Sequence, residues 1–381
     1  MEENRKKPQV RFDGYTDDWE QRKLGDEAIE MVAGGDIDKS LLDEHGKYPV
    51  IANALTDDGI VGYYASDYRI KAPAVTVTGR GDVGHAKART VDFTPVVRLL
   101  SVRSKHDVFF LENAINTLNV IVESTGVPQL TVPQLSQYEI FFPPTITEEK
   151  EIGAFFDRVD NLITLHQRKH NKLVDVKKSM LEKMFPKNGE KKPEIRFGGF
   201  TDDWEQRKLG EYVSITSGEA PSKFEEGTEL YVKVDDLNYN DKYVVDTQNK
   251  VAEHSTVKRV TKGSVVFPKR GAAIMTNKVR IMGIDSYMDT NMMALTSEKL
   301  DSEFLYNIIS KEGLYKIADT STIPQINNKH IEPYEVTIPS LDEQRRIGAY
   351  FRSLDHLITL HQREVEKLKN NKKSMLEKMF I

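Results

Sequence analysis

Residues 16–25 read TDDWEQRKLG, and the same ten residues return at 201–210. The residues before them repeat as well, with RFDGYTDDW at 11–19 and RFGGFTDDW at 196–204. A second pair of repeats lies later in each half, LITLHQR at 162–168 and 357–363 and KKSMLEKMF at 177–185 and 372–380. Repetition within one chain predicts a repeated structural unit. A short entry motif, an insert and a long terminal segment therefore follow one another, and this order occurs twice.

The two long terminal segments predict paired helices. Mostly apolar residues recur there every three or four positions, a heptad pattern typical of helices that pack along a narrow seam. We expect each helix to run for about 35 residues, or roughly 50 Å at 1.5 Å per residue, and the two helices to pair with each other. The residues expected to pair them are Phe156, Ile163, His166, Leu173, Met180, Phe351, Ile358, His361, Leu368 and Met375.

Local signals set the boundaries of these segments. Thr145 with Glu148, and Ser340 with Glu343, have the Ser/Thr-x-x-Glu spacing of a capping box. Proline, glycine and charged residues at 186–195 predict a linker. The expected divisions are a first domain with its entry motif at 1–147, a first helix at 148–185, a second domain with its entry motif at 196–342 and a second helix at 343–381. An alternative stays open, in which each helix packs on its own domain.

The inserts, residues 27–144 and 212–339, do not visibly resemble each other. Each contains short apolar runs broken by turn residues, which predict several strands in a mixed α/β domain. We therefore expect an α+β protein, in which two mixed α/β domains are separated by two long helices in a pseudo-two-fold repeat.

A basic cluster lies in each insert. Residues 69–105 contain eight Lys or Arg against two acids, and residues 258–280 contain seven and no acid, although the whole chain has a net charge of −5. Arginine beside glycine on a loop, as at 79–81 and 269–271, suits DNA, because glycine allows close approach and guanidinium can bind phosphate or guanine. The candidate DNA-binding residues are Arg69, Lys71, Arg80, Lys87, Arg89, Lys262, Lys269, Arg270, Asn277, Lys278 and Arg280.

The composition excludes several classes of protein. A chain of 381 residues is too long for one ordinary core, so two or three domains are expected. Because cysteine is missing, disulfides, cysteine-ligated zinc and thiol nucleophiles are excluded. No run of about 18 apolar residues occurs, and the first ten residues lack the apolar core of a secretory signal. We expect a cytoplasmic protein without membrane contact.

Motifs of catalytic chemistry are missing. The sequence has no GxxxxGK[ST], GxGxxG, HExxH or GxSxG motif and no Asn/Asp-Pro-Pro-Tyr/Phe tetrapeptide. His166 and His361 fall on the helical seam, where a structural role is expected. We therefore predict no catalytic residue, no metal site and no cofactor held by this chain.

The whole chain resembles the specificity subunits of type I restriction–modification systems. The resemblance rests on DDWEQRKLG, on FFPPTITEEKEIGAFFDRVDNLITLHQRK after the first insert, and on VTIPSLDEQRRIGAYFRSLDHLITLHQR after the second. It implies two target-recognition domains that each read one half of a bipartite DNA site, and two helices that form an antiparallel coiled coil and set the spacing between the halves. The segment GSVVFPKRGAAI at 263–274 resembles the family's strand and Arg-Gly loop, and VTVTGRGDVG at 75–84 is a looser match.

The resemblance also implies partners. Two methyltransferase subunits, which use S-adenosylmethionine, and two restriction and translocation subunits, which use ATP and Mg²⁺, would assemble with this chain on double-stranded DNA. The chain would then be a DNA-specificity subunit that is not catalytic by itself. Two alternatives stay open: a self-contained methyltransferase or nuclease, whose motifs are missing, and a coiled-coil adaptor with no role on DNA.

Overall fold

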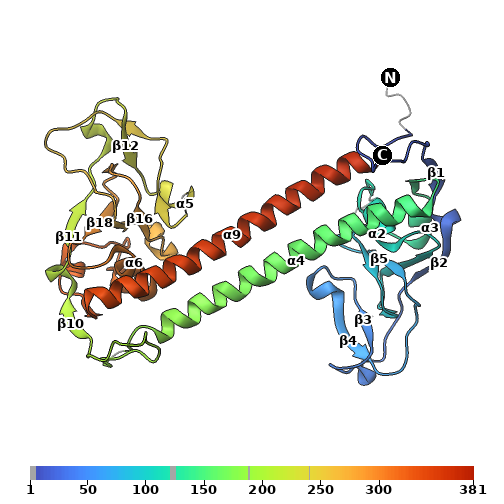
Figure 1. The fold of residues 1–381 in the computed structure, drawn as a ribbon, viewed down its shortest axis with the longest axis horizontal. Coiled ribbons are helices and arrows are strands. Elements are labelled where there is room, and N and C mark those ends of the chain that lie inside the picture. Colours follow the sequence, from blue (N-terminus) through green and yellow to red (C-terminus); the bar gives the residue numbers. More distant parts are fainter. Residues whose placement is uncertain (1–5, 121–125, 188, 240) are drawn as a thin grey trace. The chain divides into compact units, whose positions relative to one another are not determined.

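The computed structural model describes residues 6–120, 126–187, 189–239 and 241–381. The chain divides into two compact units (Figure 1). The first unit extends to Gln167 and includes Arg363–Ile381, and the second comprises Arg168–Gln362. Each unit therefore contains one insert, the beginning of one long helix and the end of the other.

The first insert folds as two sheets and a helix. One sheet has the order β2-β8-β5-β6 with antiparallel neighbours, and the other has the order β4-β3-β7, in which β3 and β7 are parallel. Helix α2 (Val108–Asn116) lies against β5 and β6. The strands are β2 (Ala28–Ala33), β3 (Tyr48–Ile51), β4 (Ile60–Tyr64), β5 (Ala74–Thr78), β6 (Ala86–Arg89), β7 (Thr94–Pro95) and β8 (Leu99–Ser104).

The second insert has a similar topology, with one additional strand, β13, that pairs in parallel with β16 at the edge of its larger sheet. Its sheets have the orders β11-β18-β15-β16-β13 and β14-β12-β17, again with one parallel pair, β12 and β17, in the smaller sheet. Helix α6 (Ser302–Glu312) takes the place of α2, against β15 and β16. The strands are β11 (Ser214–Ser217), β12 (Glu229–Val232), β13 (Tyr243–Val244), β14 (Lys250–Val251), β15 (Val265–Pro268), β16 (Arg280–Met282), β17 (Tyr287–Met288) and β18 (Met292–Thr296). Two inserts that differ in sequence are thus two versions of one domain.

The entry motifs form matching two-stranded ribbons. β1 (Glu20–Lys23) pairs with β9 (Glu139–Phe142), and β10 (Glu205–Lys208) pairs with β19 (Glu335–Ile338), both antiparallel. The remaining short elements are α1 (Leu24–Glu27), α3 (Val132–Ser136), α5 (Asp236–Tyr239), α7 (Leu314–Ile317), α8 (Asn328–Ile331), and 3-10 turns at Lys39–Leu41, Thr56–Gly59, Leu209–Glu211, Pro221–Lys223 and Ala272–Thr276.

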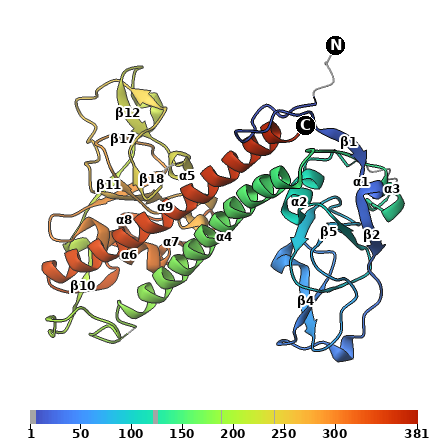
Figure 2. The ribbon, with the colours of Figure 1, turned by 45° about the vertical axis from the view of Figure 1, so that its right-hand side comes forward.

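The two long helices form as predicted. Helix α4 spans Ile146–Lys183 and helix α9 spans Leu341–Met379. Within each unit, the segments of α4 and α9 lie side by side (Figures 1 and 2). Asp160 pairs with Lys372 in the first unit, and Lys177 pairs with Asp355 in the second. A step of 17 residues forward on α4, from 160 to 177, matches a step of 17 back on α9, from 372 to 355, so the helices are antiparallel.

The predicted capping boxes form only in part. The hydroxyls of Thr145 and Ser340 accept from the amides three residues later at 3.4 Å, as expected. The carboxylate of Glu148, however, does not turn back to the cap, because it accepts two hydrogen bonds from Arg11 at 2.6 and 2.9 Å. Glu343 is held in the same way by Arg196, with both bonds at 2.7 Å. These buried pairs attach each entry motif to the helix that follows its insert.

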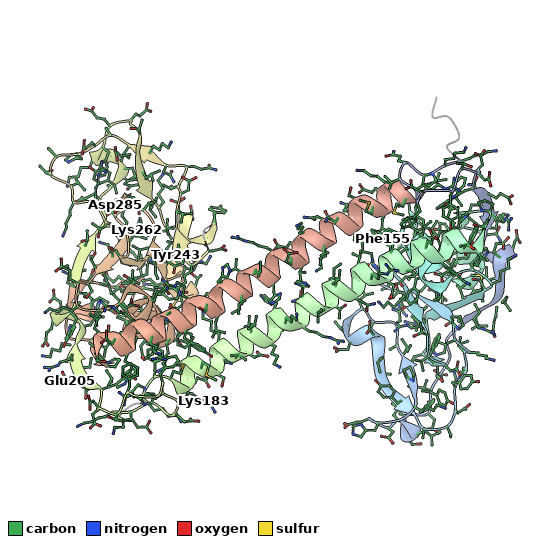
Figure 3. All side chains as sticks on the ribbon, in the orientation of Figure 1. Phe155, Lys183, Glu205, Tyr243, Lys262 and Asp285 are labelled. Atoms are coloured by element: carbon green, nitrogen blue, oxygen red, sulfur yellow. The ribbon has the colours of Figure 1, made fainter. Side chains whose placement is uncertain are left out.

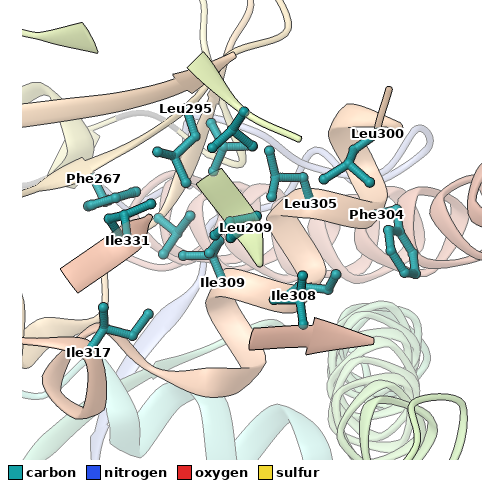
Figure 4. Close-up of a cluster of buried hydrophobic side chains, with 14 of the residues drawn as sticks. Leu209, Phe267, Leu295, Leu300, Phe304, Leu305, Ile308, Ile309, Ile317 and Ile331 are labelled. Carbon is teal, nitrogen blue, oxygen red and sulfur yellow. The ribbon is translucent and has the colours of Figure 1, made fainter. Parts of the chain in front are cut away.

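Each core contains one tryptophan and the end of a long helix. In the first unit, Trp19 contacts Phe110 of α2 and Phe380, which directly follows α9. In the second unit, Trp204 contacts Phe304 of α6 and Phe185, which follows α4 closely. Figure 4 shows the second core, with Phe304 among the aliphatic side chains of its sheet and helices.

The beginnings of the helices also pack on the domains. Ile152 and Phe156 of α4 lie in the first core, and Ile347 and Phe351 of α9 lie in the second. The alternative in which a helix packs on its own domain therefore holds for the first turns, and the helices pair beyond them. All ten predicted pairing residues are partly or fully buried. Their role in pairing stays a prediction.

Candidate nucleic-acid interface

An Arg-Gly loop follows the central strand of the main sheet in each unit. The first loop is Gly79-Arg80-Gly81, after β5, and the second is Lys269-Arg270-Gly271, after β15. Gly81 has a φ of 76° and Gly271 a φ of 82°, in the left-handed region that glycine tolerates best. The sharp turn that presents each arginine therefore depends on the glycine after it.

Both loops pair with a Pro-Gln segment from later in the insert. The amide of Gly81 donates to the carbonyl of Pro128 at 2.9 Å, and the amide of Gly271 donates to the carbonyl of Pro324 at 2.8 Å. Arg80 forms an antiparallel bridge with Gln129, as Arg270 does with Gln325. The first loop, a looser match in sequence, thus has the same backbone framework as the second.

The first Arg-Gly loop has an additional support. The side chain of Asn53 accepts from the amide of Gly79 at 2.7 Å and donates to the carbonyl of Arg80 at 2.9 Å. The guanidinium of Arg80 is partly exposed, and that of Arg270 is exposed. A cation on a fixed backbone can bind a planar acceptor such as phosphate or guanine with little loss of conformational entropy.

The other candidates in the first insert lie in different surroundings. Arg69 donates to the carbonyl of Asp36 at 2.5 Å, which fixes a neighbouring loop, and Lys71 is exposed. Lys87 is exposed, and its ammonium lies 3.9 Å from the carboxylate of Glu112. Arg89 donates to the hydroxyl of Thr76 at 3.0 Å and the carbonyl of Asp58 at 2.9 Å. Burial lowers the pKa of Arg89.

The candidates in the second insert divide into exposed and structural residues. Lys262 is exposed on a turn next to Asp285, whose carboxylate accepts from its amide at 2.7 Å (Figure 3). Burial lowers the pKa of Lys269. Lys278 contacts the amide oxygen of Asn238. Arg280 donates to the carbonyl of Val279 at 2.8 Å, and burial lowers its pKa.

Asn277 is built into the second domain. Its amide nitrogen donates to the carbonyl of Ser310 at 2.9 Å, and its amide oxygen accepts from the amide of Leu314 at 2.9 Å. Its backbone is left-handed, with a φ of 48°. These bonds join the residue after the 3-10 turn Ala272–Thr276 to helices α6 and α7, which favours a structural role for Asn277 over adenine reading.

A buried histidine cluster in the first unit was not predicted. His106 lies between the carboxylates of Glu149 and Glu27, at 2.7 and 2.9 Å, and stacks on Phe142. Burial lowers the pKa of His106, but the bonds to Glu149 and Glu27 outweigh it and raise the pKa above its ordinary value. Burial opposes the ionisation of Glu27, but hydrogen bonds from His106, Arg22 and Lys105 lower its pKa to about 2. The partners are distant in sequence, so no local pattern reveals them.

A buried lysine in the second unit joins the insert to both helices. Lys242 lies between Glu303 of α6 and Asp355 of α9, and Asp355 also pairs with Lys177 of α4. Burial opposes the charge of Lys242, but Asp355 and Glu303 raise its pKa above the ordinary value. The first unit joins α4 to α9 through Asp160 and Lys372.

The described residues form neither a metal-binding cluster nor a membrane-spanning helix. Over residues 6–120, 126–187, 189–239 and 241–381, no group of three or more His, Cys, Asp or Glu side chains is arranged to hold a metal ion. Within the same residues, no helix is both long enough and apolar enough to cross a membrane.

Comparisons with known proteins agree with the repeat. A family model described as the type I restriction modification DNA specificity domain matches residues 16–174 and 201–370. The MjaVIII specificity subunit of a type I restriction enzyme from Methanocaldococcus jannaschii is 25% identical over 94% of this chain and 91% of its own length. The MjaIX specificity subunit from the same organism is 25% identical over 49% of this chain and 46% of its own length.

A solved structure has the same fold. The crystal structure of a type I restriction–modification S subunit from M. genitalium superposes with a TM-score of 0.71, covering 98% of this chain and 99% of that chain, at 16% identity. At this identity the likeness concerns the fold.

Proposed function

Since the chain belongs to the type I restriction–modification DNA specificity family, we propose that it reads a bipartite DNA site with one half-site for each insert. It is a specificity subunit, which recognises DNA and is not catalytic by itself. The observation that carries the proposal is the Arg-Gly loop, which occurs at the corresponding place of a similar topology in both units while the surrounding sequence differs. A shared reader with different side chains suits two different half-sites.

Arg80 and Arg270 are the proposed central contacts. Each follows the end of a buried strand, and its backbone is held by the Pro-Gln bridge. A bidentate contact from such an arginine to guanine distinguishes bases by about 1–3 kcal/mol. Three exposed lysines of the inserts, Lys71, Lys87 and Lys262, are proposed to contact phosphates, which adds affinity but carries no sequence information.

Helices α4 and α9 are proposed to set the distance between the half-sites. A helix of the 38 residues of α4 is about 57 Å long at 1.5 Å per residue. Half-sites one turn of DNA apart lie about 34–36 Å from centre to centre. The helices are therefore long enough to connect two readers on one face of a duplex.

Two copies of a methyltransferase subunit are the proposed partners on the helices. The repeated LITLHQR segments expose Leu162 and Leu165 on α4 by 44% and 46%, and Leu357 and Leu360 on α9 by 39% and 43%. Duplicated apolar side chains offer two similar docking surfaces to one partner. We assign S-adenosylmethionine to these subunits, and ATP and Mg²⁺ to two restriction and translocation subunits that join them.

The proposal is tested by selecting bound duplexes from a random library with the full chain and its methyltransferase partner. Two separated half-sites should be enriched. Arg80→Ala should relax one half-site and Arg270→Ala the other, each by about 1–3 kcal/mol of discrimination. Lys192→Ala, an exposed change outside the inserts, is the matched control and should alter neither.

Two outcomes would oppose the proposal. Failure of the complex to enrich any sequence would support the coiled-coil adaptor. Methylation of DNA by the pure chain with S-adenosylmethionine would support the self-contained enzyme.

A further inference from the structure

A basic groove lies in the first unit between the insert and the end of α9. Its volume is about 480 Å³, and its walls are the β5–β6 hairpin, residues 54–58 and the last turns of α9. The basic side chains that line it are His85, Lys87, Arg89, Lys369, Lys372 and Lys373. Three come from the insert and three from the helix, so the groove exists only where the two are packed together.

Half of these basic side chains have carboxylate partners. Lys372 pairs with Asp160 at 2.7 Å, and the ring of His85 lies 2.9 Å from Asp82. Lys87 lies 3.9 Å from Glu112, and the carboxylate-bearing residue Asp58 is also part of the wall. The positive charge of the groove therefore comes mainly from the other three side chains, Arg89, Lys369 and Lys373.

Arg89, Lys369 and Lys373 have no carboxylate within ion-pair distance among the described residues. The bonds of Arg89 go to a hydroxyl and a backbone carbonyl, which do not neutralise its charge. Burial lowers the pKa of Arg89, and this effect outweighs the attraction of the Asp58 and Glu112 carboxylates, neither of which forms an ion pair with it. An anion that entered the groove would therefore find three cations that have no ion pair with a described carboxylate.

The groove adjoins the first Arg-Gly loop. Asn53 holds that loop through Gly79 and Arg80, and the residues that follow it, Ala54 and Leu55, line the groove. Residues 53–55 thus connect the loop of the proposed base-reading arginine to the wall of the groove, while Arg89 lies opposite Ala74, at the other end of β5. A DNA strand that reached Arg80 would bring its neighbouring phosphates close to the groove.

The second unit differs at the corresponding place. The repeat relates Lys369 and Lys373 of α9 to Val174 and Lys178 of α4, so one of the two lysines is replaced by an apolar residue. The insert there contributes Lys242, whose charge is taken up by Glu303 and Asp355. The junction of insert and helix is therefore closed by ion pairs in the second unit, whereas in the first it is also lined by three cations without an ion pair.

We propose that the basic groove binds the DNA backbone beside the first half-site, with Arg89, Lys369 and Lys373 as phosphate ligands. This inference rests on the proposed function and extends it, because a long helix itself then contacts DNA, and does so in one unit. The contact adds affinity without sequence preference.

The test uses the full chain with its methyltransferase partner and the selected duplex. In Lys369→Gln/Lys373→Gln, binding should weaken about equally for specific and random duplexes, and the slope of log affinity against log salt should fall by about 2, since each phosphate contact contributes about 0.9. Lys178→Gln, on the matching turn of α4, is the control and should leave the slope unchanged. Equal thermal unfolding of the variants confirms that the fold is intact.

The contrary results are distinct. An unchanged salt slope in the double variant, while Arg80→Ala still relaxes one half-site, overturns the groove and leaves the proposed function standing. Absence of specific binding by the unmodified complex overturns the function itself. Inorganic phosphate that binds the double-lysine site without competing with the duplex points to a small anion as the ligand and also overturns the proposal.

Discussion

Just before helices α2 and α6, the chain has His106 in the first unit and Leu300 in the second. The two carboxylate partners of His106 are also replaced in the second unit, Glu149 by Gln344 and Glu27 by Tyr212. Both units nevertheless keep one hydrogen bond to the backbone. Glu149 accepts from the backbone amide of Asp107 at 3.0 Å, and Gln344 accepts from that of Asp301 at 3.1 Å. One junction thus uses a titrating cluster and the other a neutral one.

The two units share a close contact between a capping aspartate and a glycine of a long helix. Asp107 and Asp301 cap α2 and α6, and each lies against a glycine of a long helix, Gly153 or Gly348. A Cβ on Gly153 would lie 2.1 Å from the Asp107 carboxylate, and one on Gly348 would lie 2.4 Å from that of Asp301. Between the two units, the close packing of aspartate against glycine is therefore the same, while the charged residues around it differ.

The largest expected effect concerns Glu148 and Glu343. Replacement of either by alanine leaves a largely buried guanidinium without its carboxylate and should cost about 3 kcal/mol of unfolding free energy. Glu148→Ala should cost more, because Glu148 also accepts from the indole of Trp19 at 3.2 Å. Each unit has one tryptophan, so Trp204→Phe or Trp19→Phe leaves fluorescence to report one unit in a denaturant titration. Equal losses in the two variants would contradict the added role of Glu148. Losses below about 1 kcal/mol would contradict the importance of both ion pairs.

Phe380→Ala and Phe185→Ala test the exchange of helix ends. Each deletes a buried ring from a core and should cost about 3 kcal/mol. Phe380→Ala should destabilise the transition reported by Trp19, although the two residues lie at opposite ends of the chain, and Phe185→Ala the transition reported by Trp204. The opposite assignment would show that α9 does not complete the first core.

The titrating cluster should make the stability of the first unit depend on pH. His106 has a raised pKa, so its contribution is complete below its unfolded value of 6.5 and is lost as pH rises through the folded value. Glu27 has a pKa lowered from 4.5 to about 2, so its contribution is present above 4.5 and is lost as pH falls toward 2. Both contributions are complete between about pH 4.5 and 6.5.

The control for this prediction is a triple variant of the first unit that carries the corresponding residues of the second unit. Unfolding titrations from pH 5 to 9 should show a declining stability for the Trp19 transition that the triple variant Glu27→Tyr/His106→Leu/Glu149→Gln reduces. The same decline in the triple variant as in the unmodified chain would locate the dependence elsewhere.

The smallest expected effect concerns the ion pairs between the helices. Asp160→Asn removes one partly exposed pair and should cost about 0.3–1 kcal/mol. Asp355→Asn should cost more, because Asp355 contacts both Lys177 and the buried Lys242. Denaturant unfolding of the two variants measures the difference, and a larger loss for Asp160→Asn would contradict the assignment.

The parts predicted from the sequence are those with local or repeated patterns. The 3-4 spacing predicted α4 and α9 within a few residues of their bounds, and the duplicated entry motif predicted a duplicated frame. The similar topology of the two inserts was not predicted, because strand order depends on pairings between residues far apart, such as β3 with β7 and β12 with β17.

In the candidate site, too, local motifs were predicted and contacts between distant residues were not. The Arg-Gly loops were visible as short motifs, whereas the Pro-Gln bridges that hold them come from about 50 residues later in each insert. Asn277 had the residue type for base reading, but its contacts with Ser310 and Leu314 are set by the tertiary fold. The groove lysines of α9 were not singled out, since their place beside the first insert follows from the antiparallel return of the helix.

The most direct test of the central claim is a map of methylated adenines in cells that contain the methyltransferase partner with this chain, or with a hybrid whose first insert comes from another specificity subunit. The account predicts a bipartite motif that depends on the chain, and a hybrid motif in which one half changes while the other half and the spacing persist. A hybrid that changed both halves, or methylation that did not depend on this chain, would contradict it.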